Sequence, residues 1–405
     1  MGGFRRLVTF ADQGVSSISN FVAVAVAANV ATVSEFGQFS LAYAGLLLFL
    51  GGQRALVGET LLVRYSQTGK LTREVASASL GATLLVAVPT IALLLAGALL
   101  SGPENSLLWL VMAAVSPFVL LQDSIRYLFI CQGRPALALL IDGLWAGGSI
   151  SAMLLVARSG GELWVVLSWW GAGAAAALAV GLILARSIPA VPSGVRWLLL
   201  NKDFAFRYLA EFAALNASTF AVLYFLVFPL GAAGVGALRA AQLLFSPLNT
   251  VFGAIKTAVI PELVRTRGTG AFRSRLLETF VLVLVLCVGW GAAVLLLPAG
   301  AGEFVLGETW HNASELRWPY AVQYLAMVPY TVLLAYFRAA QANRLSTLMR
   351  GVLAALTLVL PLALALGGST AASAWGFTGA VAVAGLCGLI AVRAGRTRSA
   401  RPAAG

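Results

Sequence analysis

The chain has 405 residues, of which 60% are hydrophobic and only 10% are charged, whereas an average soluble domain has roughly 25% charged residues. A soluble fold of this length would need a far larger polar surface, so the composition excludes a soluble enzyme. The formal net charge of +12 does not indicate a nucleic-acid partner, because the cations lie in short connections between apolar runs rather than on one face.

Apolar runs of about 20 residues follow one another along the whole chain, and each is long enough to cross ~30 Å of hydrocarbon. The hydropathy predicts twelve membrane-spanning helices, at residues 12–31, 38–63, 76–99, 107–131, 136–157, 163–185, 208–230, 236–262, 276–297, 318–342, 348–367 and 374–392. The second, fourth and eighth spans contain Gly or Pro and internal charges, so we expect them to be the least regular helices.

The connections between these spans alternate in charge. Arg and Lys gather in every second connection and at both termini, whereas the opposite connections carry mainly glutamates. The positive-inside rule places the basic side in the cytoplasm, and an even number of spans places both termini there. Arg5 and Arg6 before the first span resemble a secretory signal, but a span that is followed by eleven more is expected to stay as an anchor.

Two internal matches indicate that the chain is duplicated. The letters LVR at 62–64 recur at 263–265, and Pro117 and Pro329 are each followed nine residues later by an arginine. Both features recur near half the chain length with the same helix parity. Two halves oriented alike imply a pseudo-two-fold axis along the membrane normal, and transporters place their substrate site at such a repeat interface.

We therefore predict an all-α integral membrane fold of two pseudo-symmetric six-helix bundles. The predicted parts are a first bundle at 1–190, a cytoplasmic linker at 191–207, a second bundle at 208–393 and a basic cytoplasmic tail at 394–405. The linker contains RWLLLNKDFAF, and aromatic residues among cations are typical of a segment in the membrane interface. A plain apolar linker is the alternative.

Charged residues inside spans are costly in lipid and are the default candidates for function. Arg54 lies ten residues before Arg64 and Lys256 lies nine before Arg265, in the second and eighth spans. At about 1.5 Å per residue both lie ~14 Å from the cytoplasmic boundary, near the middle of the membrane. This pair of cations predicts a pocket for an anion, because Arg binds phosphate or carboxylate in bidentate fashion. The alternative is that each cation snorkels to the interface or pairs with a structural carboxylate.

A second group of charges lies on the fourth and fifth spans. Asp123 and Arg126 are three residues apart and share a helix face, and Asp142 follows the tight turn CQGRP at a similar depth. We expect a structural ion-pair cluster that braces the two helices. The functional alternative is a gate, or a protonatable site that couples transport to protons or sodium.

Three further polar residues are weaker candidates. Arg239, near the outer end of the eighth span, is either an exit-side substrate contact or a snorkelled anchor. Gln13 and Asn20 belong to one polar face of the first span. Such a face serves either helix packing or the lining of a cavity.

The residues that catalysis or cofactors would need are scarce. The sequence has no Gly-rich loop ending in Lys-Ser or Lys-Thr, so it predicts no ATP site. Its one histidine, His311, lies in an outward connection without a partner for a metal or a catalytic triad. Cys131, Cys287 and Cys387 lie in or beside apolar runs without metal-ligand spacing. We expect no cofactor, no metal and no enzymatic activity.

Several segments resemble a known family. The opening DQGVSSISNFVAVAVAANVATVSEFGQFSLAY and the following RALVGETLLVRYS resemble the N-terminal part of bacterial polysaccharide (O-antigen-type) flippases of the MATE-like MOP superfamily. Later segments that look like family landmarks are SPFVLLQDSIRYLFICQGRP, GALRAAQLLFSPLNTVF, VIPEL and FRAAQANR. The likeness covers essentially the whole chain, and these motifs define the superfamily better than the substrate.

The resemblance implies two six-helix bundles around a central cavity that opens alternately to each side of the bacterial plasma membrane. The implied cargo is a polyprenyl-pyrophosphate-linked oligosaccharide, and the implied partners are membrane lipid, this lipid-linked glycan and glycan-assembly proteins. Related flippases carry basic residues on the second and eighth helices, and Arg54 and Lys256 match that arrangement. The chain lacks the two extra C-terminal helices of lipid II flippases, which favours an oligosaccharide over a peptidoglycan precursor.

Two other functions remain open. A MATE-type exporter of drugs or small molecules shares the architecture but is expected to line its cavity with carboxylates and aromatic residues rather than unpaired cations. A membrane glycan polymerase or ligase is expected to carry a large outward loop with clustered polar residues. The outward connection at 298–316 is short and offers only Glu303, Glu308, His311 and Glu315.

Overall fold

The protein is described by a computed structural model that covers residues 2–65, 71–255 and 259–399. About 90% of the chain is helical, and the described residues contain no strand. Ten helices among them are long and apolar enough to cross a membrane. The predicted all-α membrane fold is therefore confirmed. Contacts divide the chain into two compact units, Met1–Phe220 with Val305–Glu308 (the N-terminal unit) and Ala221–Phe304 with Thr309–Gly405 (the C-terminal unit).

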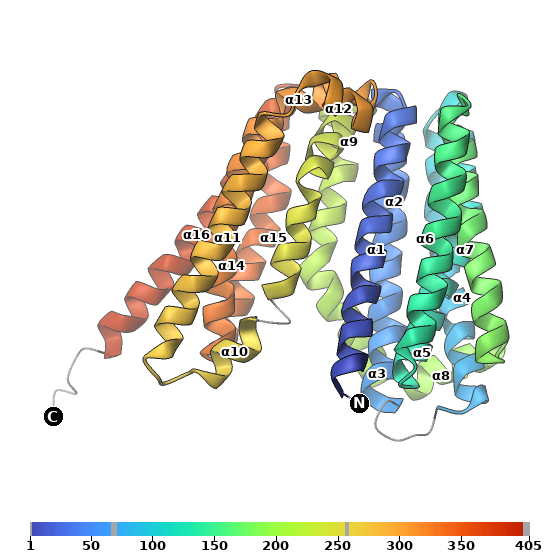
Figure 1. Ribbon diagram of the computed structural model, residues 1–405, viewed down its shortest axis with the longest axis horizontal. Helices are drawn as coiled ribbons and strands as arrows, with labels where there is room; N and C mark the ends of the chain where they lie inside the picture. Colours follow the sequence, from blue (N-terminus) through green and yellow to red (C-terminus); the bar gives the residue numbers. More distant parts are fainter. Residues whose placement is uncertain (1, 66–70, 256–258, 400–405) are drawn as a thin grey trace. The chain divides into compact units, whose positions relative to one another are not determined.

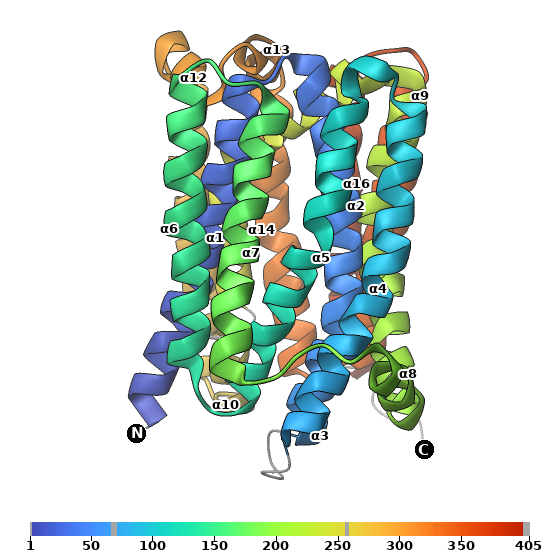
Figure 2. The ribbon, with the colours of Figure 1, turned by 90° about the vertical axis from the view of Figure 1, so that its right-hand side faces the viewer.

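The N-terminal unit is a bundle of long helices (Figures 1 and 2). Its elements are α1 (Gly2–Val30), α2 (Val33–Gln53), the π-helix η1 (Arg54–Glu59), α3 (Thr60–Tyr65), α4 (Arg73–Leu100), α5 (Pro103–Cys131), α6 (Pro135–Arg158), α7 (Leu163–Ala185), α8 (Val191–Leu200) and the first part of α9 (Lys202–Ala254). Because α2, η1 and α3 follow one another without a break, they form one helical run, Val33–Tyr65.

The C-terminal unit continues from α9. Its other elements are α10 (Ile260–Arg265), α11 (Ala271–Leu295), α12 (Ala299–Leu306), α13 (Thr309–Glu315), α14 (Arg317–Ala339), α15 (Asn343–Ala365) and α16 (Thr370–Ser399), and the end of α12 belongs to the N-terminal unit. Helix α9 bends at Gly231, whose φ of 67° and ψ of 177° are not helical. Only glycine adopts this conformation at low cost.

Ten of the predicted spans each coincide with one helical run, within a few residues at most ends. The predicted spans 208–230 and 236–262 lie largely within α9, because the connection between them is only the bend at Gly231. The second span was expected to be irregular, and η1 interrupts it. Residues 400–405 of the basic tail predicted at 394–405 lie outside the described residues.

Local sequence signals set several helix boundaries. Thr32 caps α2 through a capping box, in which its side chain accepts from the Glu35 backbone and the Glu35 carboxylate accepts from the Thr32 backbone at 2.9 Å. Pro103 and Pro135 stand in the first turns of α5 and α6, where the missing proline N–H has no helical partner to lose. These signals fix where α2, α5 and α6 begin.

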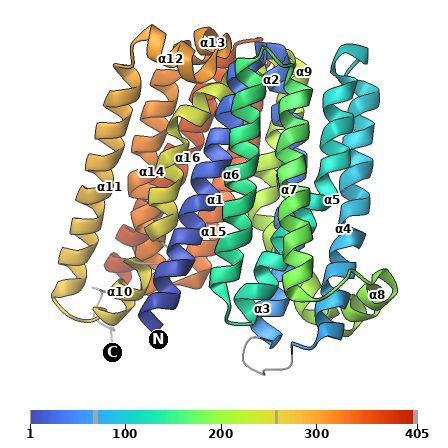
Figure 3. The same ribbon diagram turned by 45° about the vertical axis from the view of Figure 1, so that its right-hand side comes forward.

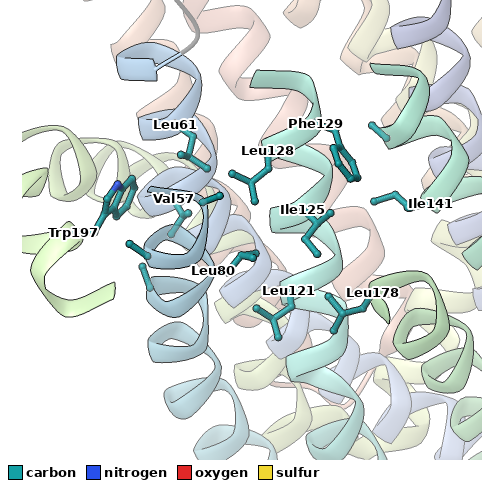
Figure 4. Close-up of a cluster of buried hydrophobic side chains, with 14 residues drawn as sticks. Val57, Leu61, Leu80, Leu121, Ile125, Leu128, Phe129, Ile141, Leu178 and Trp197 are labelled. Carbon is teal, nitrogen blue, oxygen red and sulfur yellow. The ribbon is translucent and has the colours of Figure 1, made fainter. Parts of the chain in front are cut away.

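A cluster of buried apolar side chains holds η1, α3, α4, α5, α6, α7 and α8 together in the N-terminal unit (Figure 4). Leu61, Leu80, Ile125 and Leu128 in this cluster are fully buried. Trp197 of α8 lies beside Val57, Leu61 and Leu80 in the same cluster. Burial of each such side chain contributes ~1.5–3 kcal/mol, so α8 is an integral part of this unit.

Candidate functional site

Arg54 begins the π-helix η1, in the middle of the run Val33–Tyr65. Two consecutive residues of this run pair with two consecutive residues of α5: Gln53 Nε2 donates to Ser124 Oγ at 2.5 Å, and Arg54 donates to Asp123. Single π-turns inside α-helices are frequent at functional sites. The double pairing fixes the Arg54 guanidinium against α5.

The Arg54 guanidinium belongs to a chain of four charges. Its Nε and Nη2 donate to the two oxygens of Asp123 at 2.9 and 2.7 Å. Arg126 continues the chain, with 3.8 Å between its Nη1 and Asp123 Oδ1 and 3.1 Å between its Nε and Asp142 Oδ2. Gln122 Nε2 donates to the other oxygen of Asp142 at 2.7 Å. Two arginines and two aspartates therefore balance one another.

The four side chains differ in their exposure. The Arg54 side chain is 39% exposed, whereas those of Asp123, Arg126 and Asp142 are 5%, 10% and 7% exposed. A buried charge is tolerated only with a partner of opposite sign and with its hydrogen bonds satisfied. Asp123, Arg126 and Asp142 meet this condition, so they form the interior of the cluster, and Arg54 is the most exposed of the four charges.

The cluster lines a cavity within the N-terminal unit. The cavity measures about 40 Å³, or about 430 Å³ when the open space at its mouth is counted. Its polar and aromatic lining residues are Asn20, Tyr43, Arg54, Gln122, Asp123, Arg126, Asp142, Trp145 and Trp170. A smaller hollow of about 20 Å³, or about 290 Å³ with the open space at its mouth, shares Asn20, Asp142, Trp145 and Trp170 with it. The two hollows therefore adjoin each other along the α1, α6 and α7 side of the site.

Three aromatic residues form one wall of the cavity. The rings of Trp145 and Trp170 lie 5.5 Å apart between centroids, and Tyr43 meets Trp170 edge-on at 6.2 Å. Trp145 Nε1 donates to the Trp170 carbonyl at 3.1 Å, which fixes the orientation of its ring. The site thus combines an aromatic wall with a balanced set of charges and with amide groups.

The structure brings Arg54, Asp123, Arg126 and Asp142 together and places Asn20 on the same cavity. The expected ion pairing of α5 and α6 is confirmed by the contact between Arg126 and Asp142. The anion-pocket interpretation assumed that Arg54 is an isolated cation. The structure pairs it instead with Asp123, which binds it in bidentate fashion.

Of the other three predicted residues, the structure describes the side chain of Arg239 alone. Lys256 lies outside the described residues, and so does the side chain of Gln13. Arg239 belongs to the C-terminal unit, where its Nη1 donates to Gln242 at 2.6 Å and it lies within electrostatic range of Tyr324. Tyr324 in turn donates to Asn249 at 3.1 Å.

Sequence reasoning missed Tyr43, Gln122, Trp145 and Trp170. Gln122 precedes Asp123, so its neighbourhood in sequence was a usable signal. The aromatic residues gave no comparable signal, because a tryptophan in an apolar span faces either lipid or a cavity. Among the described residues, no group of three His, Cys, Asp or Glu side chains is arranged for a metal.

Comparison with known proteins identifies the fold. No protein-family model and no curated protein matches the sequence. The structure is similar to an inward-facing multidrug resistance MATE family transporter of the MOP superfamily, with a TM-score of 0.70, 13% identity and 96% of each chain covered.

Two further solved structures agree. The lipid II flippase MurJ in an inward closed conformation has a TM-score of 0.69 and 12% identity, over 96% of this chain and 87% of that one. A MOP superfamily transporter from Pyrococcus furiosus, described as having a binding pocket of reverse polarity, has a TM-score of 0.59 and 12% identity, over 98% and 95%. These proteins are transporters and flippases rather than enzymes, and the present chain has the multi-pass helical fold of MOP-superfamily transporters.

Proposed function

We propose that the chain is a flippase of the bacterial polysaccharide type, which carries a polyprenyl-pyrophosphate-linked oligosaccharide across the plasma membrane by alternating access. Its fold is shared with exporters and with a lipid II flippase. The observation that carries the proposal is the cavity in the N-terminal unit, in which a partly exposed Arg54 stands beside amide, carboxylate and tryptophan side chains. Both termini are assigned to the cytoplasm on the charge pattern of the connections.

The chemistry of the cavity fits a charged saccharide. Arg54 has five N–H donors, and its hydrogen bonds to described residues use Nε and Nη2, both with Asp123. The remaining donors suit an oxygen of a phosphate or a uronic acid. Asn20, Gln122 and the carboxylate oxygens suit hydroxyl groups, and the Trp145 and Trp170 rings suit the apolar face of a sugar ring.

Further roles are proposed for the other predicted residues. Lys256 and Arg239 are assigned to the same cargo as cations of the second half, and Gln13 is assigned to the cavity lining with Asn20. Asp123, Arg126 and Asp142 are assigned to gating or to coupling with a proton or sodium gradient, because rearranging a buried ion pair is the step that such a gradient can drive. Glycan-assembly proteins are the proposed partners.

The proposal is tested by reconstituting the purified protein in vesicles with a fluorescent polyprenyl-pyrophosphate oligosaccharide and measuring how much reaches the opposite leaflet. We expect Arg54→Gln to lower the transport rate by about tenfold or more, since a charge-assisted hydrogen bond is worth ~1.5–3 kcal/mol. Arg158→Gln removes an exposed cation at the end of α6 and is the matched control.

A folding defect is separated from a binding defect by the double variant Arg54→Gln/Asp123→Asn. It leaves no unpaired carboxylate behind, so it is expected to fold like the unmodified protein and to remain inactive. Transport at the unmodified rate in this double variant would contradict the role of Arg54. If neither the unmodified protein nor any variant transports the fluorescent lipid, the proposed cargo is contradicted.

A MATE-type exporter is the second candidate, and one observation favours it. The cavity carries two carboxylates and three aromatic residues, and its cations are paired with the carboxylates. An exporter of aromatic cations would lower the accumulation of ethidium in cells that express the chain. Asp142→Asn would abolish that effect, whereas a flippase would leave ethidium accumulation unchanged.

A further inference from the structure

Helix α8 and the start of α9, residues 191–207, form a surface that the transport proposal does not use; we call it the α8 surface. Figures 2 and 3 show α8 running across the end of the N-terminal unit beside α4, rather than along it. With 10 residues, α8 is far shorter than the ~20 residues that a membrane crossing requires. It is a surface helix at the end of a membrane-spanning bundle.

One side of α8 is fixed against the unit. The backbones of α8 and α4 are in direct contact, because a Cβ atom on Gly194 would lie 2.4 Å from the Ala82 nitrogen. The Ala190 N–H also donates to the Ser77 carbonyl at 3.0 Å. Trp197 is buried in the apolar cluster of Figure 4 and stacks with Tyr65 at 6.4 Å between centroids. The rotation of α8 about its axis is therefore set by packing.

The opposite side of α8 is exposed and apolar. Val191, Val195 and Leu199 follow one another at helical spacing and form an exposed ridge, in which Leu199 is 63% exposed. Leu200 beside it is 70% exposed. A soluble environment gives no reason for such a ridge on a helix whose other side is already buried, whereas the acyl boundary of a membrane does.

Cations lie close to the apolar ridge in the sequence. Arg196, Lys202 and Arg207 are exposed, and Asp203 is the one acidic residue between positions 191 and 207. Apolar residues that dip into the acyl boundary, together with lysines and arginines at the headgroup level, are the combination that binds anionic lipid. Spanning helix α4 begins within the same end of the unit, so a headgroup layer is within reach of these cations.

We propose that the α8 surface binds the headgroups of anionic phospholipids in the leaflet at this end of the N-terminal unit. The ridge of Val191, Val195 and Leu199 inserts at the acyl boundary, and Arg196, Lys202 and Arg207 contact the phosphates. The cations alone would suit either an anionic lipid or an acidic protein. The exposed ridge favours the lipid, because it needs an apolar phase beside it. The binding does not depend on which substrate the protein carries.

The α8 surface is also tied to the helix that carries Arg54. Arg64, at the end of the run Val33–Tyr65, donates through Nη1 to the Leu200 carbonyl at 3.2 Å and to Asn201 Oδ1 at 2.8 Å. Its guanidinium lies 5.7 Å from the centroid of the Phe204 ring. Lipid bound at α8 therefore acts on the end of the same helical run whose middle lines the cavity.

The test measures which phospholipid stays bound to the purified protein in mixed micelles of phosphatidylglycerol and phosphatidylcholine, by native mass spectrometry. The test variant carries Arg196→Gln, Lys202→Gln and Arg207→Gln. The matched control removes the same charge from exposed positions of the C-terminal unit, Arg267→Gln, Arg273→Gln and Arg344→Gln. We expect the test variant to lose about tenfold or more of its preference for phosphatidylglycerol, and the control to keep most of it.

Equal losses in the two triple variants, or no preference in the unmodified protein, would overturn the proposal. A second measurement guards against misfolding. A fluorophore on Leu199→Cys in a Cys387→Ser background is quenched by phospholipids brominated in their acyl chains. We expect brominated phosphatidylglycerol to quench this fluorophore more strongly than brominated phosphatidylcholine does. If neither lipid quenches it, the ridge does not reach the membrane.

Discussion

The buried charge cluster predicts that its two arginines contribute very unequally to stability. Arg126 is 10% exposed and stands between two carboxylates that are 5% and 7% exposed. Arg126→Gln removes the cation that contacts the Asp142 carboxylate at 3.1 Å, and the Asp142 side chain is only 7% exposed. Removing one partner of a buried ion pair costs ~3–5 kcal/mol, because the other charge stays buried without compensation.

Arg54→Gln is expected to cost less, about 1–2 kcal/mol. Arg54 is 39% exposed, so water partly replaces what the mutation removes. Its partner Asp123 also keeps Arg126, whose Nη1 is 3.8 Å away and needs to move by less than an ångström to form a direct hydrogen bond. The order of the two losses, rather than either value, is the prediction.

The assay is equilibrium denaturation of the purified protein in detergent micelles, followed by circular dichroism. The double variant Arg126→Gln/Asp142→Asn is the decisive control. It removes both charges of the pair, so it is expected to recover most of the stability that Arg126→Gln loses. Equal losses for Arg54→Gln and Arg126→Gln, or a double variant as unstable as Arg126→Gln, would refute the reasoning.

Three further predictions concern packing and the cavity wall. Gly194→Ala is expected to lower the free energy of unfolding by about 1–3 kcal/mol, because its Cβ would meet the α4 backbone at 2.4 Å. Gly143→Ala, whose Cβ would have nothing within 4 Å, should be neutral or stabilise by up to ~1 kcal/mol. Thermal melts in detergent compare the two variants. Gly231→Ala forces an alanine into a φ of 67° and should lower the free energy of unfolding by ~1–3 kcal/mol in the same melts. A variant as stable as Gly143→Ala would show that the bend in α9 relaxes freely. Trp145→Phe keeps an aromatic face but loses the hydrogen bond to Trp170, so it should retain most of the transport rate in the vesicle assay. Trp145→Ala should lower the transport rate about tenfold. Equal rates for the Phe and Ala variants would contradict stacking on the cargo.

Much of the scaffold could be predicted from the sequence, because lipid imposes long apolar helices whose lengths are visible as hydropathy. The predicted spans 136–157 and 163–185 differ from α6 and α7 by no more than one residue at any end. Hydropathy also separated the spans 208–230 and 236–262 beside Gly231, where α9 bends. A sharp change of direction needs only one residue of unusual φ and ψ, so these two spans follow each other without a polar connection.

The charge cluster was predicted only in part. Asp123, Arg126 and Asp142 lie on adjacent helices joined by a tight turn, so their proximity followed from the chain. The pairing of Arg54 with Asp123 joins residues 69 positions apart. Depth in the membrane gave the level of Arg54 but not the direction of its side chain, and the π-turn that sets this direction has no sequence signal.

The equality of positive and negative charges in the cluster also has an electrical consequence. A single charge that crosses a membrane potential of 100 mV exchanges about 2.3 kcal/mol with the field. Arg54, Asp123, Arg126 and Asp142 form a set without net charge while both aspartates are ionised, so the voltage does no net work when this set moves across the field as one rigid body without turning. An anionic cargo bound there would add its own charge to that movement. The voltage would then act on the step in which the protein moves with its cargo, and not on these four side chains when the empty protein returns.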